Sequence, residues 1–542
     1  MSSNGFRQLQ SEARTFTGLT GTSYSLSYSY NQGDQVKSVN YHGTTGYAPG
    51  APLTYGHFGF TGAPPYTLSG VVTNAQGQAV AGATVTLSGA ASGTTTTNGG
   101  GQFSFGNLQG GTYTLTPTLA GYVFNPSSIT YNDLQKSWTN ANFTALPPLQ
   151  TTFDKNVNYT YNTVGALSGV GTNLIGTDPN NTTNVINGLQ FKAFGAIRQL
   201  NYGNGLQLTM GYNANRQQPI TMKVGPNGTG NIIDYTYEYY DASGNNNNRI
   251  RKITDGVDSA YTTEYSYDQW NRLTAATAPA YGRSYSYDAW GNLRAAATSG
   301  IAPPLYTLNY AQNATTAPAT NRIQSVTENG QLQAFYYDNA GNMTAGDGMT
   351  YAYDAANRLT SVNNGALGQY GYDGEGMRVK KVEGGGTVWY VRSSKLGNTA
   401  FEVTSVGVQR AYVYSGQGKL LAEQASDGQF YWMHSNHLHS ARALTDTQGS
   451  LVYKGQFDPH GQALLEWSAS GTANLNARKF TGYERDAATN LDYANARTYN
   501  AGRGRFLQPD LSKNVTSPAA LNRYSYVGND PVNFFGSLGI AV

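Results

Sequence analysis

The chain has 542 residues and no cysteine, which excludes thiol catalysis, cysteine-ligated zinc sites and disulfide bonds. Charged residues make up only 12% of the sequence, and the net charge of +3 comes from scattered Lys and Arg, so no nucleic-acid partner is expected. No run of about 20 apolar residues is present, so no membrane span is expected either.

The 42 Tyr and 66 Gly favour strands joined by tight turns, and therefore an all-β fold. The first segment, residues 1–66, fits this composition with short Tyr-bearing strands, in which Tyr30-Asn31 takes the place of a Tyr-Asp pair that recurs further along. The first ten residues lack the apolar centre of a signal peptide, so no export signal is visible.

Residues 67–146 follow a different pattern, in which Val alternates with Thr between Gly-bounded turns. Phe103 and Phe105 likewise occupy alternate positions. This pattern predicts a small all-β sandwich. The flanking segments both have strands of the first kind, so we expect a domain inserted at a loop of a longer ribbon. The segment resembles the carboxypeptidase regulatory-like domain, a transthyretin-like sandwich, in Gly70-Val71-Val72, Gly82-Ala83, Gly101-x-Phe103 and Gly111-Thr112-Tyr113. That resemblance implies a folding or adhesive accessory without peptidase chemistry, and it leaves sugar or protein binding open.

Residues 147–430 repeat one short phrase, for example YSYDQWNRLT from Tyr265 and YSYDAWGNLR from Tyr285. In each repeat a Tyr precedes an Asp, and a Gly or Asn follows three residues later. Asp favours the first position of a type I turn, where its carboxylate accepts backbone N–H bonds, and Gly and Asn tolerate positive φ. Each phrase therefore predicts a β-hairpin. The predicted turn residues are Asp241, Asp268, Asp288, Asp338, Asp354, Asp373, Gly244, Asn271, Gly291, Gly341, Asn357 and Gly376.

The repeated side chains also admit functional interpretations. The Asp residues could form a row of acids or metal ligands, and the Tyr rows could stack on carbohydrate. Turn formation by Asp and packing of Tyr between strands are the favoured interpretations. The return strands are expected to begin at Leu273, Leu293, Met343 and Leu359.

The Tyr-Asp phrases resemble the YD-repeat, or RHS, family, and residues 431–542 resemble its associated core module. The core resemblance rests on YWMHSNHLHSARALTDTQGSLVYKGQFDPHGQ from Tyr431, RKFTGYERDAATNLDYANARTYNAGRGRFLQPD from Arg478 and LNRYSYVGNDPVNFFGSLGI from Leu521. The resemblance implies a long antiparallel β-ribbon of hairpins that coils into a hollow shell, with the core module closing one end. Because Leu, Ile and Phe are few, we expect a cavity lined by Tyr and Asn in place of a packed core.

The stretch HSNHLH, residues 434–439, suggests metal binding because imidazole is a common ligand. If the stretch is a strand, only His437 and His439 share a face, so these two are the metal candidates. The family pattern is His-x-Asp-His-Leu-Gly-Ser, from which Asn436 and His439 depart. A structural role is the favoured interpretation, and no metal or other cofactor is expected.

Toxin-bearing members of the family carry paired Asp-Pro-x-Gly motifs whose two aspartates cut the chain behind the core. Here Asp510 is kept, but Leu511 replaces Pro, and Gly536 and Ser537 occupy the positions of the second Asp and Pro. The mechanism needs two carboxylates that share a site. Autoproteolysis is therefore expected to be lost, and Asp510 is a vestigial catalytic candidate in a protein that is not an enzyme.

We interpret the sequence as a non-catalytic structural protein, secreted or on the bacterial cell surface, that forms a β-shell. Open strand edges of an incomplete ribbon are expected to bind partner chains or further copies of the protein. The alternative is the encapsulating shell of a polymorphic toxin whose C-terminal toxin is absent from this chain. A carbohydrate partner stays open as well.

Overall fold

The computed structural model describes residues 65–146, 152–174, 183–300, 306–310, 321–469, 476–511 and 522–536 apart from isolated positions, and the backbone of strands between residues 2 and 44. The regular structure is β-strand, as the composition predicts, with short 3-10 helices at η1 (Ser259–Tyr261), η2 (Asn363–Gly365), η3 (Phe480–Gly482) and η5 (Val527–Asn529). Within the described ranges, no helix has the length and apolarity needed to cross a membrane.

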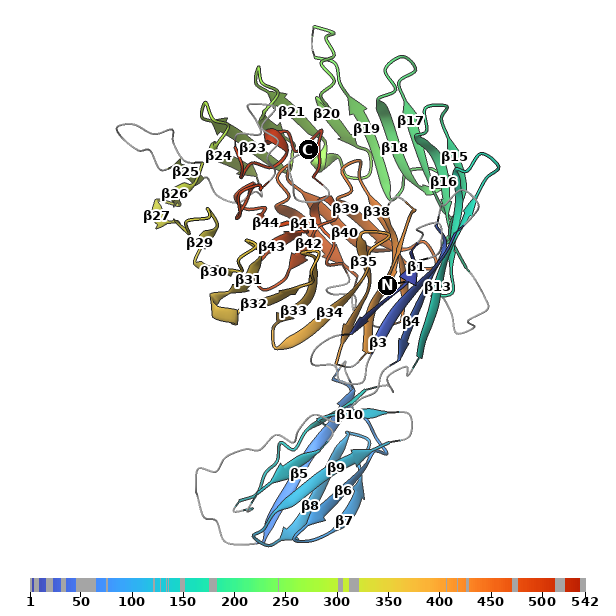
Figure 1. The fold of residues 1–542 in the computed structure, drawn as a ribbon, viewed down its shortest axis with the longest axis vertical. Coiled ribbons are helices and arrows are strands. Elements are labelled where there is room, and N and C mark those ends of the chain that lie inside the picture. Colours follow the sequence, from blue (N-terminus) through green and yellow to red (C-terminus); the bar gives the residue numbers. More distant parts are fainter. Residues whose placement is uncertain are drawn as a thin grey trace.

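A 19-stranded sheet forms the first part of the ribbon, with antiparallel pairing between successive strands (Figure 1). Its strands are β1 (Ser2–Ser3), β2 (Leu9–Thr15), β3 (Ser23–Tyr30), β4 (Val36–Thr44), β13 (Thr152–Tyr161), β14 (Leu167–Thr172), β15 (Thr183–Phe191), β16 (Ile197–Tyr202), β17 (Leu206–Tyr212), β18 (Pro219–Pro226), β19 (Ile233–Glu238), β20 (Lys252–Asp255), β21 (Thr263–Tyr267), β22 (Leu273–Thr277), β23 (Tyr281–Tyr287), β24 (Leu293–Gly300), β25 (Tyr306–Tyr310), β26 (Ile323–Glu328) and β27 (Gln331–Ala334). We call this sheet the wall.

The ribbon continues as a 14-stranded antiparallel sheet, and a four-stranded sheet follows it. The strands of the larger sheet are β28 (Tyr336–Tyr337), β29 (Met343–Gly346), β30 (Met349–Tyr353), β31 (Leu359–Val362), β32 (Gly368–Tyr372), β33 (Arg378–Glu383), β34 (Gly386–Ser393), β35 (Asn398–Thr404), β36 (Gly407–Tyr414), β37 (Leu420–Gln424), β38 (Phe430–Ser435), β39 (Ala441–Thr445), β40 (Leu451–Phe457) and β41 (Ala463–Ser468). Those of the smaller sheet are β42 (Glu484–Asp486), β43 (Leu491–Ala494), β44 (Arg497–Asn500) and β45 (Arg505–Phe506). The larger sheet runs without a break through residues 430 and 431, where we predict the core module to begin.

The predicted insertion is confirmed, because β4 pairs with β13 and Thr44 lies opposite Thr152. Between these neighbouring strands the chain forms two four-stranded sheets, β10-β12-β5-β8 and β11-β9-β6-β7, which lie below the larger body in Figure 1. Alternate residues such as Leu68, Val85 and Phe143 are buried between them. The strands are β5 (Tyr66–Asn74), β6 (Thr84–Gly89), β7 (Gly93–Thr96), β8 (Gln102–Leu108), β9 (Tyr113–Thr118), β10 (Val123–Asn125), β11 (Ile129–Tyr131) and β12 (Phe143–Leu146).

The Tyr-Asp phrases form the hairpin turns of the ribbon. Asp288 Oδ1 accepts the backbone N–H groups of Trp290 and Asn292, each at 2.9 Å, and Gly291 adopts a φ of +71°. The other predicted turns have the same geometry, with positive φ at Gly244, Asn271, Gly341, Asn357 and Gly376. The return strands β22, β24, β29 and β31 begin at the residues expected from the sequence.

Several tyrosines at the ends of outgoing strands, most of them directly before a turn Asp, have a second role, which is to join consecutive hairpins. Tyr287 donates its hydroxyl to the carbonyl of Leu273, the first residue of the preceding return strand, at 2.7 Å. Tyr310, Tyr353 and Tyr372 reach Leu293, Met343 and Leu359 in the same way, at 2.6–2.8 Å. Each aromatic ring is thus packed within the ribbon, and its polar end is satisfied by a backbone carbonyl. We call this bond the tyrosine bridge.

The ribbon turns back on itself, so that later strands contact earlier ones. Tyr159 donates to the carbonyl of Tyr414 at 3.0 Å, and Trp432 donates to that of Val185 at 2.8 Å. In Figure 1 the wall occupies the periphery and β38–β45 lie toward the centre of the larger body. We call β38–β45 the inner strands. The last described range, residues 522–536, then runs back along the hairpin turns of the wall, where Asn529 Nδ2 donates to the carbonyl of Gly291 at 2.8 Å. We call this range the C-terminal segment.

The interior differs in one respect from the Tyr- and Asn-lined cavity that we expected. A continuous cluster of buried apolar residues extends from Val157 to Val532 and joins both large sheets. Val, Leu and Ala at the inward positions fill this space together with Tyr, because every second strand residue faces inward. The shell fold is therefore as predicted, but its inner strands pack against the wall over much of their length.

A buried ion-pair network fixes the four-stranded sheet formed by β42–β45 to the ribbon. Arg378 of β33 contacts Glu484 at 3.0 Å and Asp486 at 2.8 Å, and Lys381 contacts the same two carboxylates at 3.0 and 3.2 Å. Burial alone would raise the pKa of Glu484, but the neighbouring Arg378 and Lys381 hold it well below its ordinary value. Buried charges without partners are costly, so this docking position is specific.

Removing one tyrosine bridge tests its contribution. In Tyr287→Phe the ring is kept and only the hydroxyl is lost, so we expect the free energy of unfolding to fall by about 1 kcal/mol. Urea unfolding of the shell measures this difference. The matched control is Tyr240→Phe, which alters the same phrase at a ring that is 51% exposed and should change stability by less than about 0.5 kcal/mol. Equal losses in the two variants would contradict a structural role for the bridge.

Candidate functional site

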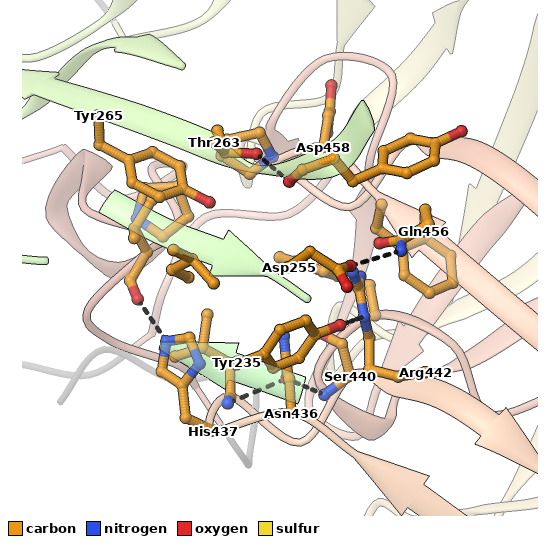
Figure 2. A pocket seen from close by; sticks show the side chains of 18 of the residues that line it. Tyr235, Asp255, Thr263, Tyr265, Asn436, His437, Ser440, Arg442, Gln456 and Asp458 are labelled. Carbon is orange, nitrogen blue, oxygen red and sulfur yellow. Dashed lines mark hydrogen bonds between the residues drawn. The ribbon is translucent and has the colours of Figure 1, made fainter. Parts of the chain in front are cut away.

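A pocket of about 70 Å³ lies where the wall, the inner strands and the C-terminal segment meet (Figure 2). The wall contributes side chains from β19, β20, β21 and β23, and the inner strands contribute side chains from β39 and β40. Pro531 and Val532 of the C-terminal segment complete the lining. The pocket is therefore assembled from three separate parts of the chain.

Two carboxylates belong to this pocket, and both have several hydrogen-bond partners. Asp255 accepts the backbone N–H groups of Val257 and Asp258, each at 3.0 Å, and the amide of Gln456 at 3.2 Å (Figure 2). Asp458 pairs with the buried guanidinium of Arg283 at 2.9 Å. Each acid thus ties the wall to the inner strands.

A guanidinium and a phenol make a further connection across the pocket. Arg442 Nε donates to the hydroxyl of Tyr235 at 2.8 Å, and the guanidinium lies 5.7 Å from the centre of the same ring (Figure 2). Thr263 and Tyr281, both from the wall, lie within 3.3 Å of each other through their hydroxyls. Burial is the main cause of the raised pKa of Tyr235, so its hydroxyl stays protonated and available as an acceptor for Arg442.

His437 reaches the C-terminal segment from the opposite side of the pocket. Its Nε2 donates to the carbonyl of Val532 at 3.0 Å (Figure 2). Burial lowers the pKa of His437 to about 4, so the ring is neutral at pH 7. His439 packs on the ring of Phe535 at 4.7 Å, with its pKa also lowered to about 4 by burial.

The interpretation of HSNHLH as a strand is wrong, because β38 ends at Ser435. Asn436 Oδ1 instead accepts the N–H groups of Leu438 at 3.0 Å and Ser440 at 2.9 Å, and His439 adopts a φ of +64°. The stretch is thus the same turn as in the Tyr-Asp phrases, with Asn for Asp and His for Gly. Among the described residues, no group of three or more His, Cys, Asp or Glu is placed to hold a metal ion.

Sequence reasoning missed turns of this kind that lack the preceding Tyr. Asp446 and Asp458 cap their turns as the predicted aspartates do, and Gly449 and Gly461 have φ of +78° and +92°. The Asp-x-x-Gly spacing alone would have found both. The connections between the wall and the inner strands carry no such local signal, because their partners are far apart in the sequence.

Asp510, the vestigial catalytic candidate, lies away from the pocket lining. It is 4% exposed and pairs with Arg497, whose Nη2 is 3.0 Å from its Oδ2. Burial lowers the pKa of Arg497 to about 10. Gly536, at the position of the second aspartate, is held by the hydroxyls of Tyr483 and Tyr526.

The buried histidines predict a pH dependence of stability. His460 is 3% exposed, packs against Tyr285 at 4.9 Å and has a pKa that burial lowers to about 4, against 6.5 ordinarily. The unfolded chain therefore binds protons between pH 6.5 and 4 that the folded chain does not, and stability falls as the pH falls through this window. Urea unfolding at pH 7, 6, 5 and 4 measures this loss.

The variant His460→Leu removes this one titration without introducing a polar group. At pH 7 to 8 its stability should be independent of pH, as in the unaltered protein. Between pH 6.5 and 4 its stability should fall less steeply, by up to about 1.4 kcal/mol per pH unit. Identical slopes in the two proteins would show that folding does not change the pKa of His460.

Known protein families match both parts of the structure, the coiled ribbon and the inserted sandwich. Residues 157–532 match the family model Teneurin YD-shell, and residues 67–144 match the Carboxypeptidase regulatory-like domain. The chain is 30% identical over 206 residues to the tRNA3(Ser)-specific nuclease WapA of Bacillus spizizenii, a match that covers 37% of this chain and 9% of that protein. It is 27% identical over 263 residues to toxin subunit YenC1 of Yersinia entomophaga, covering 43% of this chain and 26% of that one.

Among solved structures, the crystal structure of TcdB2-TccC3-Cdc42 superposes with a TM-score of 0.58 and 17% identity. The superposition covers 96% of this chain and 27% of that chain, and it shows that the two share the shell fold. The chain spans less than a third of the length of each of these relatives. Because the first family model matches most of its residues, the protein belongs to the Teneurin YD-shell family and carries a carboxypeptidase regulatory-like domain in its ribbon.

Proposed function

We propose that the protein is a non-catalytic, extracellular structural protein whose shell binds a partner chain at an open strand edge. The observation that carries this proposal is β41, the last strand of the 14-stranded sheet. It pairs with β40 on one side, and no strand of the described ranges pairs with its other side. An unpaired edge presents N–H and C=O groups to which a second strand can bond.

The composition of β41 supports binding at this edge. The strand reads ALLEWS, and Trp467 is 45% exposed. Edges that stay unpaired usually carry Lys or Pro on the strand, and β41 has neither. Glu466, which is also exposed, is engaged by Tyr453 at 2.7 Å and by Lys479. The exposed apolar residues of the strand are Ala463 and Trp467, and Leu464 and Leu465 are partly exposed.

The pocket supports a structural role for the buried polar groups. Asp255 and Asp458 are occupied by connections between wall and inner strands, and Arg442 is occupied by Tyr235. His437 is occupied by the backbone of the C-terminal segment. We therefore assign to these residues the task of holding the coiled ribbon closed. The turn aspartates and their Gly or Asn partners are assigned to hairpin formation.

A second candidate function is the enclosure of a toxin by the shell. The observation in its favour is the similarity to a nuclease and to a toxin subunit, WapA and YenC1, and to a Tc-type assembly with the same fold. Under this function the inner strands would face a guest chain. Carbohydrate binding by exposed aromatic side chains stays a prediction.

Association at the β41 edge is tested by light scattering on the full chain. At micromolar concentration we expect a mass above that of the monomer, because an apolar edge pairs with a second copy when no other partner is present. Trp467→Lys should return the protein to the monomer. The control is Trp290→Lys, which places the same charge at a 47% exposed Trp in a hairpin turn and should leave association unchanged. A monomer in the unaltered protein would contradict the proposal.

The absence of self-cleavage is tested separately by intact mass spectrometry after prolonged incubation. We expect a single uncleaved mass, because the carboxylate of Asp510 is paired with Arg497. Asp510→Asn should also stay uncleaved, and its stability should be lower by about 3 kcal/mol, since the change leaves a buried guanidinium without its ion-pair partner. A fragment formed by the unaltered protein but not by Asp510→Asn would overturn the non-catalytic assignment and favour the toxin shell.

A further inference from the structure

A second cavity, of about 120 Å³, lies between the 14-stranded sheet and the four-stranded sheet formed by β42–β45. Basic side chains from three places in the chain line it: Arg392 at the end of β34, Lys419 just before β37, and Arg478 before η3. His439 lies beside them, and no Asp or Glu belongs to the lining of this cavity. We call this cavity the basic cavity.

The guanidinium of Arg392 lacks a carboxylate partner among the described residues. Its Nη2 donates to the carbonyl of Gly397 at 2.8 Å, and its Nη1 lies 3.4 Å from Thr399 Oγ1. Both acceptors are neutral. Arg392 is 6% exposed, and burial lowers its pKa from the ordinary value. The charge of Arg478 acts in the same direction, whereas Tyr493, Tyr414 and Asp373 act to raise this pKa without reversing the shift. A buried cation in this situation is stabilised by any anion that enters the cavity.

Arg478 and Lys419 add further positive charge to the cavity. Arg478 pairs with Glu484 at 3.8 Å, and Glu484 is also engaged by Arg378 and Lys381 at 3.0 Å. Burial alone would lower the pKa of Arg478, but the phenols of Tyr414 and Tyr412 and the carboxylates of Glu484 and Glu402 raise it above its ordinary value. The Nε of Arg478 is buried and has no hydrogen-bond partner among the described residues. Burial lowers the pKa of Lys419, and no described carboxylate forms an ion pair with it.

Neutral donors surround the same space. The residues Thr399, Ser435, Tyr414, Tyr493 and Asn398, which carry hydroxyl or amide groups, also line the cavity. Planar guanidinium groups bind the oxygens of carboxylate and phosphate with two parallel hydrogen bonds, and an ammonium adds a point charge. The set of donors thus suits an oxyanion and does not suit a metal cation.

From this arrangement we propose that the basic cavity is a binding site for a small oxyanion of the phosphate or carboxylate class, held by Arg392, Lys419 and Arg478. The bound anion supplies counter-charge to Arg392 and Lys419, with which no described carboxylate forms an ion pair. Because the cavity joins the ribbon to the four-stranded sheet, occupancy also strengthens the contact between these two parts of the shell. Neither the site nor this effect depends on what the shell encloses or which partner it binds.

The test is calorimetric unfolding of the full chain with inorganic phosphate or acetate, each from 0 to 10 mM, at constant ionic strength set by chloride. Ligand that binds only the folded state raises Tm, and the rise saturates as the site fills. We expect a saturating rise of about 2–5 °C in the shell transition with at least one of the two anions. A response to phosphate alone identifies a tetrahedral anion, and a response to acetate identifies a carboxylate.

Lys419→Gln separates specific binding from general salt effects, because phosphate also stabilises proteins by exclusion from their surface. Without added anion this variant should be as stable as the unaltered protein or more so, since an uncompensated charge is removed. Its anion response should be lost. The control is Lys454→Gln, whose ammonium pairs with Asp258 at 2.9 Å outside the basic cavity and which should keep the full response.

Arg392→Gln should lose the response as well, with folding verified by circular dichroism. If Arg392→Gln does not fold, Lys419→Gln decides the question alone. No response of the unaltered protein to either anion would overturn the proposal. An equal response in the unaltered protein and in Lys419→Gln would do the same, since the effect would then arise from exclusion.

Discussion

The structure depends on the tyrosine bridge, in which a phenol at the end of one hairpin donates to the first carbonyl of the preceding return strand. Tyr287 and Leu273 form one such bond at 2.7 Å, and Tyr372 and Leu359 form another at 2.6 Å. Each bridge places an aromatic ring between strands and satisfies its polar end in the same step. A chain with only 39% hydrophobic residues can therefore build a continuous wall, because Tyr provides apolar surface and a directed hydrogen bond together.

Bridges between neighbours make a ribbon, but they do not close it. Closure comes from contacts between residues far apart in the chain, such as Arg283 with Asp458 and Arg442 with Tyr235. Buried charged groups of this kind add little net stability, yet removing one partner is costly, so they specify which inner strand meets which part of the wall. The basic cavity differs from these connections, because its cations have no matching carboxylates in the lining.

Most of the fold was predictable from residue patterns, and the candidate site was not. The Asp-x-x-Gly turns were predictable because the carboxylate and the residue with positive φ are close in sequence, as in Asp288 and Gly291. The same rule, applied without the Tyr, would have placed Asn436 and His439 in a turn and not on a strand. The pocket was beyond such reasoning, since Tyr235 and Arg442 meet only after the ribbon has coiled.

The sequence by itself determined the all-β ribbon, its hairpin turns and the inserted sandwich, because each of these follows from residues within one turn or one strand. Tertiary structure alone decided that the inner strands pack on the wall, that Asp510 is paired with Arg497, and that His437 holds the C-terminal segment. It also decided that Arg392, Lys419 and Arg478 meet at a cavity whose lining contains no carboxylate. The reason is that burial and charge pairing depend on which surfaces meet when the ribbon closes, and no local pattern encodes the partner across that distance.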